Sequence, residues 1–301
     1  MERTSLIARI QIITAMITFG TLGVFVKNIS LSSAEIALWR GVIAFFVLSL
    51  FMVVSGRFSS LSTYKGKIVK LVFSGVAIGF NWMLLFEAYR YTSIALSTLS
   101  YYFAPTIVVI GSSIVFKEKL NTKQIICFII SSTGLVLIIG VSGGGSNDFI
   151  GVLYGLGAAV LYGTVVLTNK ATGEIDGLSR TWIQFAAAII VLLPYTSLVS
   201  GFHITSLALP GLINLIILGV VHTGIIYYVY YSAIAHVKGQ QVAILSYIDP
   251  IIAVILSVAL LNESITTLQL VGGLLILGST MVNEIKLKAS RGISSKLHIH
   301  K

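Results

Sequence analysis

Long apolar stretches separated by short polar connections dominate this chain. A helix needs about 20 mostly apolar residues to cross the hydrocarbon core of a bilayer. Such stretches are predicted at residues 8–27, 33–54, 68–90, 93–116, 122–141, 150–170, 178–200, 210–234, 239–261 and 266–285. The connections are rich in Gly, Ser and Asn, as in residues 142–148. The pattern predicts an all-α membrane protein of ten transmembrane helices.

The composition supports the same membrane setting. Hydrophobic residues make up 56% of the 301 residues and charged residues 10%, whereas roughly a quarter of a soluble domain is charged. The single cysteine, Cys127, excludes an intramolecular disulfide and a cysteine cage for a metal. A formal charge of +10 would favour nucleic acid as the partner of a soluble protein. In a chain this apolar, we expect the lipid bilayer and no nucleic acid.

The positive residues gather on one side of the predicted membrane. With the N-terminus in the cytoplasm, the cytoplasmic segments carry all but three of the 20 Lys and Arg residues. The exceptions are Lys27 and Arg90 on the outer side and Arg40 within the second span. Because cytoplasmic loops are enriched in Lys and Arg, we expect both termini in the cytoplasm of a multi-pass protein of the cell (inner or plasma) membrane.

The sequence also contains an internal duplication. Moving residues 102–124 forward by 145 positions gives the identical pairs Tyr102/Tyr247, Pro105/Pro250, Ile107/Ile252, Val109/Val254, Ile110/Ile255, Ser112/Ser257, Glu118/Glu263, Thr122/Thr267 and Gln124/Gln269. An offset of 143 aligns Gly20 with Gly163, Thr21 with Thr164, Lys27 with Lys170, and Trp39 with Trp182.

The number of spans in each copy determines how the copies are related. Five spans per half is an odd number, so the second copy enters the membrane from the opposite face as an inverted repeat. Such repeats place a solute near the bilayer midplane, between the halves. We expect a first five-helix repeat at 1–145, a second at 146–287, and a basic cytoplasmic tail at 288–301.

The duplicated blocks resemble those of a known superfamily. Residues 102–118 and 247–263 each close the fourth span of a half with a Pro…Glu pattern, and in this they resemble the drug/metabolite transporter (DMT) superfamily, specifically its EamA-type ten-helix carriers. The resemblance extends from about residue 8 to residue 285. It implies a secondary carrier similar to bacterial exporters of amino acids and other metabolites, with a central cavity lined by helices 1, 3, 4, 6, 8 and 9.

Polar side chains near the middle of the spans are the candidate solute-binding residues, because polar groups are costly in lipid. The set is Asn81, Trp82, Tyr101, Tyr102, Tyr162, His222, Tyr247 and Asp249. The aromatic members are interpreted either as a stacking wall for a solute or as helix packing. We expect Pro105 and Pro250 to break their helices, since proline leaves a carbonyl one turn earlier unpaired.

Asp249 and His222 are the candidate coupling residues. Asp249 aligns with Ala104 of the first half. Because it is an acid near the middle of its span, it is expected either to attract a substrate ammonium or carry a proton, or only to fasten helices. His222 is expected either to accept a proton or pair with Asp249, or only to make one interhelical hydrogen bond. Neither stands at metal-ligand spacing with a second acid or His, so neither a metal nor another cofactor is expected.

Other polar residues are assigned structural roles. Glu35 and Arg40 lie near the outer end of the second helix, which is peripheral in the resembling carriers, and Glu118 and Glu263 recur at helix ends. Residues 227–231 are rich in Tyr and are interpreted as an interfacial belt or a vestibule.

These observations predict a carrier that works by alternating access and exports amino acids or related small metabolites. Proton coupling is the hypothesis for its driving force, because the midplane holds ionisable groups, and facilitated diffusion is the alternative. The alternative solutes are cationic or aromatic compounds, including drugs. A membrane-embedded enzyme and a channel are the rival classes, but the spans contain no cluster of acids to hold Mg²⁺ and no nucleotide-binding motif. The sequence leaves the oligomeric state open, and a monomer satisfies the pattern.

Overall fold

The computed structural model describes residues 2–140, 146–234 and 236–284, and helices dominate all three ranges. They are α1 (Glu2–Lys27), α2 (Ser33–Val54), α3 (Ile68–Tyr91), α4 (Ile94–Tyr101), α5 (Ala104–Val115), α6 (Thr122–Gly140), α7 (Ser146–Thr172), α8 (Gly177–Val199), α9 (Leu209–Ile217), α10 (Ile226–Ile234), α11 (Gly239–Ser246), α12 (Ile248–Leu261) and α13 (Thr267–Glu284). Short 3-10 helices occupy Arg57–Lys67 and Ile204–Ser206, and a π-helical segment, Leu218–Ile225, joins α9 to α10. The predicted tail at 288–301 lies outside the described residues.

The helices make up the ten predicted spans. Within the described ranges, nine helical stretches are long and apolar enough to cross a membrane. Four of these combine consecutive elements, namely the end of the first 3-10 helix with α3, α4 with α5, α9 with the π-helical segment and α10, and α11 with α12. The tenth span is α13, whose 18 residues include the polar Gln269, Asn283 and Glu284.

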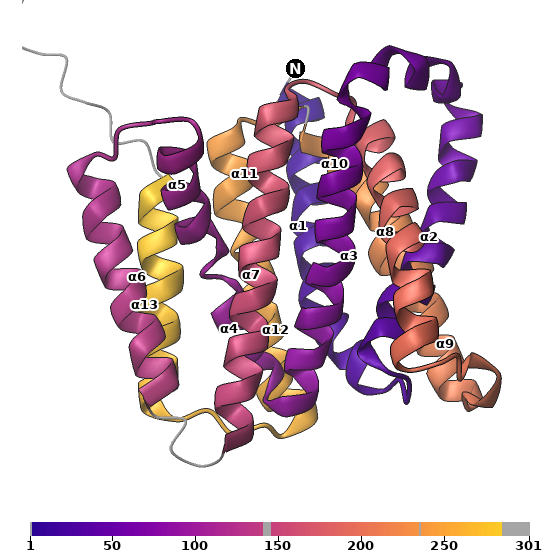
Figure 1. Ribbon diagram of the computed structural model, residues 1–301. Coiled ribbons are helices and arrows are strands. Elements are labelled where there is room, and N and C mark those ends of the chain that lie inside the picture. Colours follow the sequence, from indigo (N-terminus) through magenta and orange to yellow (C-terminus); the bar gives the residue numbers. More distant parts are fainter. Residues whose placement is uncertain (1, 141–145, 235, 285–301) are drawn as a thin grey trace, which may run out of the picture.

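The bundle places the tenth span beside the fifth. In Figure 1, α6 and α13 lie side by side at one end of the bundle, whereas α2, α8 and α9 lie at the other. A Cβ added at Gly134 of α6 would lie 2.5 Å from the Gly272 carbonyl oxygen of α13, and one added at Gly272 would lie 2.6 Å from the Gly134 carbonyl oxygen. Small residues therefore let these two backbones approach closely. α1 begins and α13 ends on the same side, as an even number of spans requires (Figure 1).

The first helix of each repeat packs on the fourth span of the other repeat. α1 packs on α12, and α7 packs on α5. A Cβ added at Gly20 would lie 2.6 Å from Ile252 Cβ and 2.7 Å from the Asp249 carbonyl oxygen, while one added at Gly163 would lie 3.0 Å from Ile107 Cγ2. Because Gly20 aligns with Gly163 and Ile107 with Ile252, the same contact occurs twice, each time between the halves. The duplication is thus a 5+5 repeat in three dimensions.

The fourth and ninth spans are interrupted at equivalent places. Two residues separate α4 from α5, and Pro105 lies in the first turn of α5. Tyr247 separates α11 from α12, and Pro250 lies in the first turn of α12. The first turn of a helix tolerates proline because its N–H groups have no partner within the helix. Both interruptions place irregular backbone next to the space between the halves.

Candidate solute-binding cavity

A cavity of about 430 Å³ lies between the two repeats. Most of its lining comes from α1, α3, α4, α5, α7, α10, α11 and α12, which belong to spans 1, 3, 4, 6, 8 and 9. Single residues of α2, α8 and α13 complete it, namely Arg40, Gln184 and Glu284. Both halves therefore contribute to one internal space.

The predicted site residues divide into a group on the cavity and a group away from it. The cavity brings together Asn81, Trp82, Tyr101, Tyr102, Tyr162, Tyr247 and Asp249, with Pro105 beside them. Pro250 is buried and does not line the cavity. His222 does not line it either.

His222 lies in the π-helical segment and contacts α1. Its Nε2 atom is 2.8 Å from the Thr21 hydroxyl, and its Nδ1 atom is 3.3 Å from the Ile217 carbonyl oxygen. Its ring stands edge-on to Phe25, with centroids 4.7 Å apart, and the residue is 2% exposed. The histidine thus fastens the π-helical segment to α1, which corresponds to the interhelical hydrogen bond considered above.

Asp249 is held by a tyrosine of the opposite repeat. The Tyr102 hydroxyl donates a hydrogen bond to Asp249 Oδ2 at 2.7 Å, and it also lies 3.4 Å from the Ser246 carbonyl oxygen. That carbonyl is one turn before Pro250, so the proline leaves it without its usual helical donor. The acid therefore sits at a polar notch in the ninth span.

The site departs from the symmetry of the fold at this acid. The rings of Tyr102 and Tyr247, which are equivalent in the two repeats, lie 6.4 Å apart. Ala104 also lines the cavity at the position equivalent to Asp249. The two halves thus supply similar aromatic walls but different chemistry, with the carboxylate on one side.

Aromatic rings form much of the remaining wall. Tyr227, Tyr230 and Tyr231 of α10 line the cavity, whereas Tyr228 stacks on Phe51 with centroids 4.3 Å apart. Three of these four tyrosines therefore line the cavity, in agreement with the vestibule interpretation and not with a lipid-facing belt.

Arg40 lines the cavity, although the sequence predicted only a structural role for it. It is 3% exposed, and its Nε donates a hydrogen bond to the Thr223 hydroxyl at 2.6 Å. Its guanidinium carbon lies 4.6 Å from the Trp82 ring centroid and 5.4 Å from that of Phe86. A charged residue inside an apolar span is a signal of function. That signal was set aside in the sequence because the second helix is peripheral in the resembling carriers.

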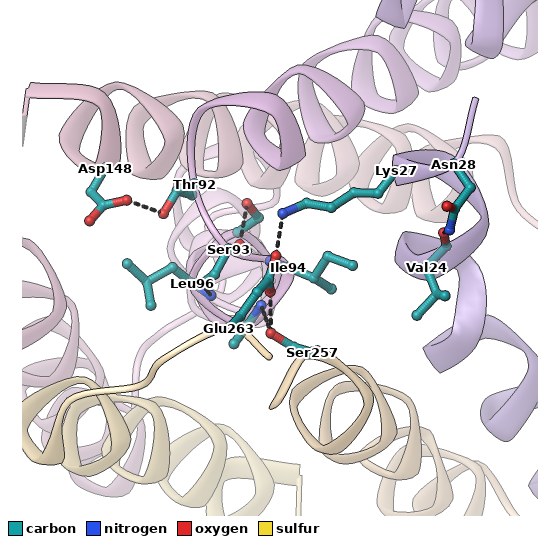
Figure 2. Close-up of polar contacts among 12 residues, drawn as sticks. Val24, Lys27, Asn28, Thr92, Ser93, Ile94, Leu96, Asp148, Ser257 and Glu263 are labelled. Atoms are coloured by element: carbon teal, nitrogen blue, oxygen red, sulfur yellow. Dashed lines mark hydrogen bonds and ion pairs between the residues drawn. The ribbon is translucent and has the colours of Figure 1, made fainter. Parts of the chain in front are cut away.

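A network of polar contacts joins the repeats on the side of the membrane where α1 ends. Lys27 forms an ion pair with Glu263, which also accepts hydrogen bonds from the Ser257 hydroxyl and, at 2.8 Å, from the backbone N–H of Ile94 (Figure 2). The Lys27 and Glu263 side chains are 29% and 12% exposed. The Glu263 carboxylate therefore ties α1, α4 and α12 together at one point.

Buried apolar side chains lie behind this network. Leu22 and Tyr89 line the cavity and are 8% and 6% exposed, and Phe86 and Ile94 beside them are 0% and 1% exposed. The cavity is therefore closed on the side of Lys27.

The equivalent ion pair on the opposite face is open to solvent. Lys170 Nζ lies 2.6 Å from Glu118 Oε1, and the two side chains are 45% and 52% exposed. On this side the cavity lining includes Asn169 and Tyr231, which are partly exposed. The same contact between repeats is thus enclosed on one face and solvated on the other.

A ten-helix inverted repeat with an internal cavity between its halves is the architecture of a membrane transporter. The model of the EamA-like transporter family matches residues 6–140 and 149–284 of this chain. The chain belongs to that family, and the two matched ranges reproduce the duplication.

Similar proteins are named as transporters. An uncharacterized transporter of Bacillus subtilis, YxxF, is 26% identical over 252 residues, covering 83% of this chain and 80% of the relative. An uncharacterized transporter of Archaeoglobus fulgidus is 26% identical over 278 residues, covering 90% of this chain and 94% of the relative. A protein of known crystal structure has the same fold, with a TM-score of 0.63 at 16% identity, over 91% of this chain and 96% of its own. These relatives support a multi-pass membrane transporter.

Proposed function

We propose that this protein is a secondary carrier that exports amino acids or related small metabolites by alternating access. The observation that carries the proposal is the placement of Asp249 beside a cavity that both repeats line. A carboxylate in that position attracts a solute ammonium group and is able to exchange a proton with it. Because the acid stands at the break between α11 and α12, a hinge motion of the ninth span would change its surroundings.

The two ion pairs between the repeats support alternating access. The Lys27–Glu263 pair is enclosed by further hydrogen bonds, while the Lys170–Glu118 pair is solvated. Rocking one half against the other would open the first contact and enclose the second, since the two are equivalent in the fold. With the predicted topology, the conformation described here is closed to the outside.

Cationic or aromatic compounds are the second candidate class of solutes. The rings of Trp82, Tyr101, Tyr162 and Tyr227 favour this class, because aromatic faces attract cations and stack on flat groups. The two classes differ in whether the solute must also carry a negative group.

Solute flux in proteoliposomes tests the proposal. The purified chain is reconstituted, loaded in turn with amino acids, polyamines and aromatic amines, and assayed for counterflow of the labelled compound. Saturable counterflow of an amino acid, absent from protein-free vesicles, is the expected result. Flux that never saturates would indicate a channel, and no flux of any compound would contradict the proposal.

A further inference from the structure

Arg40 is a buried cation without a carboxylate partner in the described ranges. The ion pairs formed there join other residues, and the hydrogen bond from Nε to Thr223 is the one that Arg40 makes. A guanidinium group carries five N–H donors, so this bond uses one of them. Burying a charge without a partner is costly, and a bound anion would remove that cost.

The free donors of Arg40 face the cavity. Arg40 belongs to the cavity lining, and its two terminal nitrogens are not fully enclosed by protein atoms. Since no hydrogen bond to the described residues occupies them, these N–H groups open onto the solute space. Thr223 holds the inner nitrogen and Trp82 lies against the guanidinium at 4.6 Å. The fork is therefore fixed in orientation before a solute arrives.

We propose that Arg40 binds the carboxylate of a zwitterionic solute whose ammonium group is held at Asp249. The inference rests on the proposed function, in which this cavity is the solute site. The planar guanidinium fork matches a carboxylate and forms two parallel hydrogen bonds with it. The described lining contains one basic residue, Arg40, and two acids, Asp249 and Glu284, of which Glu284 is exposed at the end of α13. Arg40 and Asp249 together present the charge pattern of an α-amino acid.

The same pair of charges rejects neighbouring classes of solute. A simple amine would leave Arg40 buried and unpaired, and a phosphate or other dianion would meet the carboxylate of Asp249. Specificity of this kind comes from the groups that a wrong solute leaves unsatisfied. Arg40 therefore separates amino acids from the cationic compounds that the aromatic wall alone would admit.

Matched sets of compounds test the assignment. The reconstituted full-length chain is assayed with leucine, 3-methylbutylamine and 4-methylpentanoate, and with phenylalanine, 2-phenylethylamine and 3-phenylpropanoate, as competitors of counterflow. The unmodified protein is expected to prefer each amino acid over its amine by about 100-fold or more, because a site built for a polar group strongly rejects the analogue that lacks it. Arg40→Gln should reduce this preference to within about threefold, while the preference over the acid without an amine remains.

Two further variants separate recognition from folding. Arg40→Lys keeps the positive charge but not the fork, so the preference should fall by about tenfold instead of vanishing. Arg90→Gln removes an arginine that is 56% exposed and does not line the cavity, and it should behave like the unmodified protein. The melting midpoint of each variant reports whether it is folded.

Each outcome bears on one of the two proposals. Equal transport of amines and amino acids by the unmodified protein, or an unchanged preference in both Arg40 variants, would overturn the role of Arg40 and leave the carrier standing. Saturable flux of amines alone would do the same. Absence of flux for every compound would contradict the proposed function, and with it the inference.

Discussion

Lys27 and Glu263 join the first helix of one repeat to the ninth span of the other, and Lys170 and Glu118 make the same contact on the opposite face. Lys27 aligns with Lys170, and Glu118 aligns with Glu263. Each half therefore supplies the lysine of one pair and the glutamate of the other. The two pairs consist of the same residue types but differ in exposure. Their coupling free energies should therefore differ.

The Lys27–Glu263 pair should be the stronger of the two. In a double-mutant cycle with Lys27→Gln and Glu263→Gln, we expect a coupling free energy of about 0.5–3 kcal/mol, as for residues in one network. The corresponding cycle with Lys170→Gln and Glu118→Gln should give about 0.2–1 kcal/mol, because solvent and salt screen exposed pairs. Denaturation of the purified protein in detergent measures both. Equal couplings would show that the enclosure of Glu263 has no energetic effect.

Weakening this pair should open the cavity on the side of Lys27. Leu22→Cys, introduced with Cys127→Ala so that no other thiol is present, places a reporter on the closed side of the cavity. An impermeant thiol reagent applied from that side should label it several-fold faster when Glu263→Gln is added. Glu118→Gln is the matched control and should not accelerate labelling. Unchanged labelling with Glu263→Gln would contradict a latch function of the pair.

Asp249→Asn should separate solute exchange from proton coupling. The amide keeps the size of the side chain and accepts the Tyr102 hydrogen bond, so the fold is expected to persist. It does not bind and release a proton, so accumulation driven by a pH gradient should be lost while some counterflow remains. Uptake by proteoliposomes with and without an imposed gradient measures this. Persistent accumulation in the variant would exclude Asp249 as the coupling group.

Gly20 should tolerate no side chain, unlike a glycine that faces open space. An added Cβ at Gly20 meets the backbone of Asp249 at 2.7 Å, so Gly20→Ala should lower stability by about 1–3 kcal/mol through overpacking. A Cβ at Gly278 meets nothing within 4 Å, and Gly278→Ala should be neutral or stabilise α13 by about 0.5–1 kcal/mol. The comparison of melting midpoints is the measurement, and similar losses in both variants would argue against close packing of α1 on α12.

The sequence predicts the spans well because hydrophobic length decides whether a helix crosses a membrane. The predicted spans agree with the observed helices to within a few residues at most ends, including the polar tenth span at Thr267–Glu284. The resemblance named the correct family, because the Pro…Glu blocks are both duplicated and regularly placed. Tyr102 and Asp249 belong to these duplicated blocks and lie next to their prolines. Their place on the cavity could therefore be predicted from the sequence as well.

The positions of Arg40 and His222 could not be derived in this way. A π-helical segment adds a residue to a turn, which rotates the following side chains away from the face that a regular helix would present, and sequence periodicity does not reveal it. His222 lies in this segment and contacts Thr21 instead of the cavity. Arg40 lies on α2, and whether α2 reaches the cavity depends on how all the helices of the bundle pack together.

The two ion pairs between the repeats also form at different stages of synthesis. Lys170 and Glu118 are 52 residues apart, so both are already in the membrane when the sixth span is inserted. Lys27 precedes Glu263 by 236 residues and has no such partner until the ninth span leaves the ribosome. During synthesis the Lys27–Glu263 pair therefore forms only after almost the whole chain has been made, whereas its counterpart needs little more than half of it.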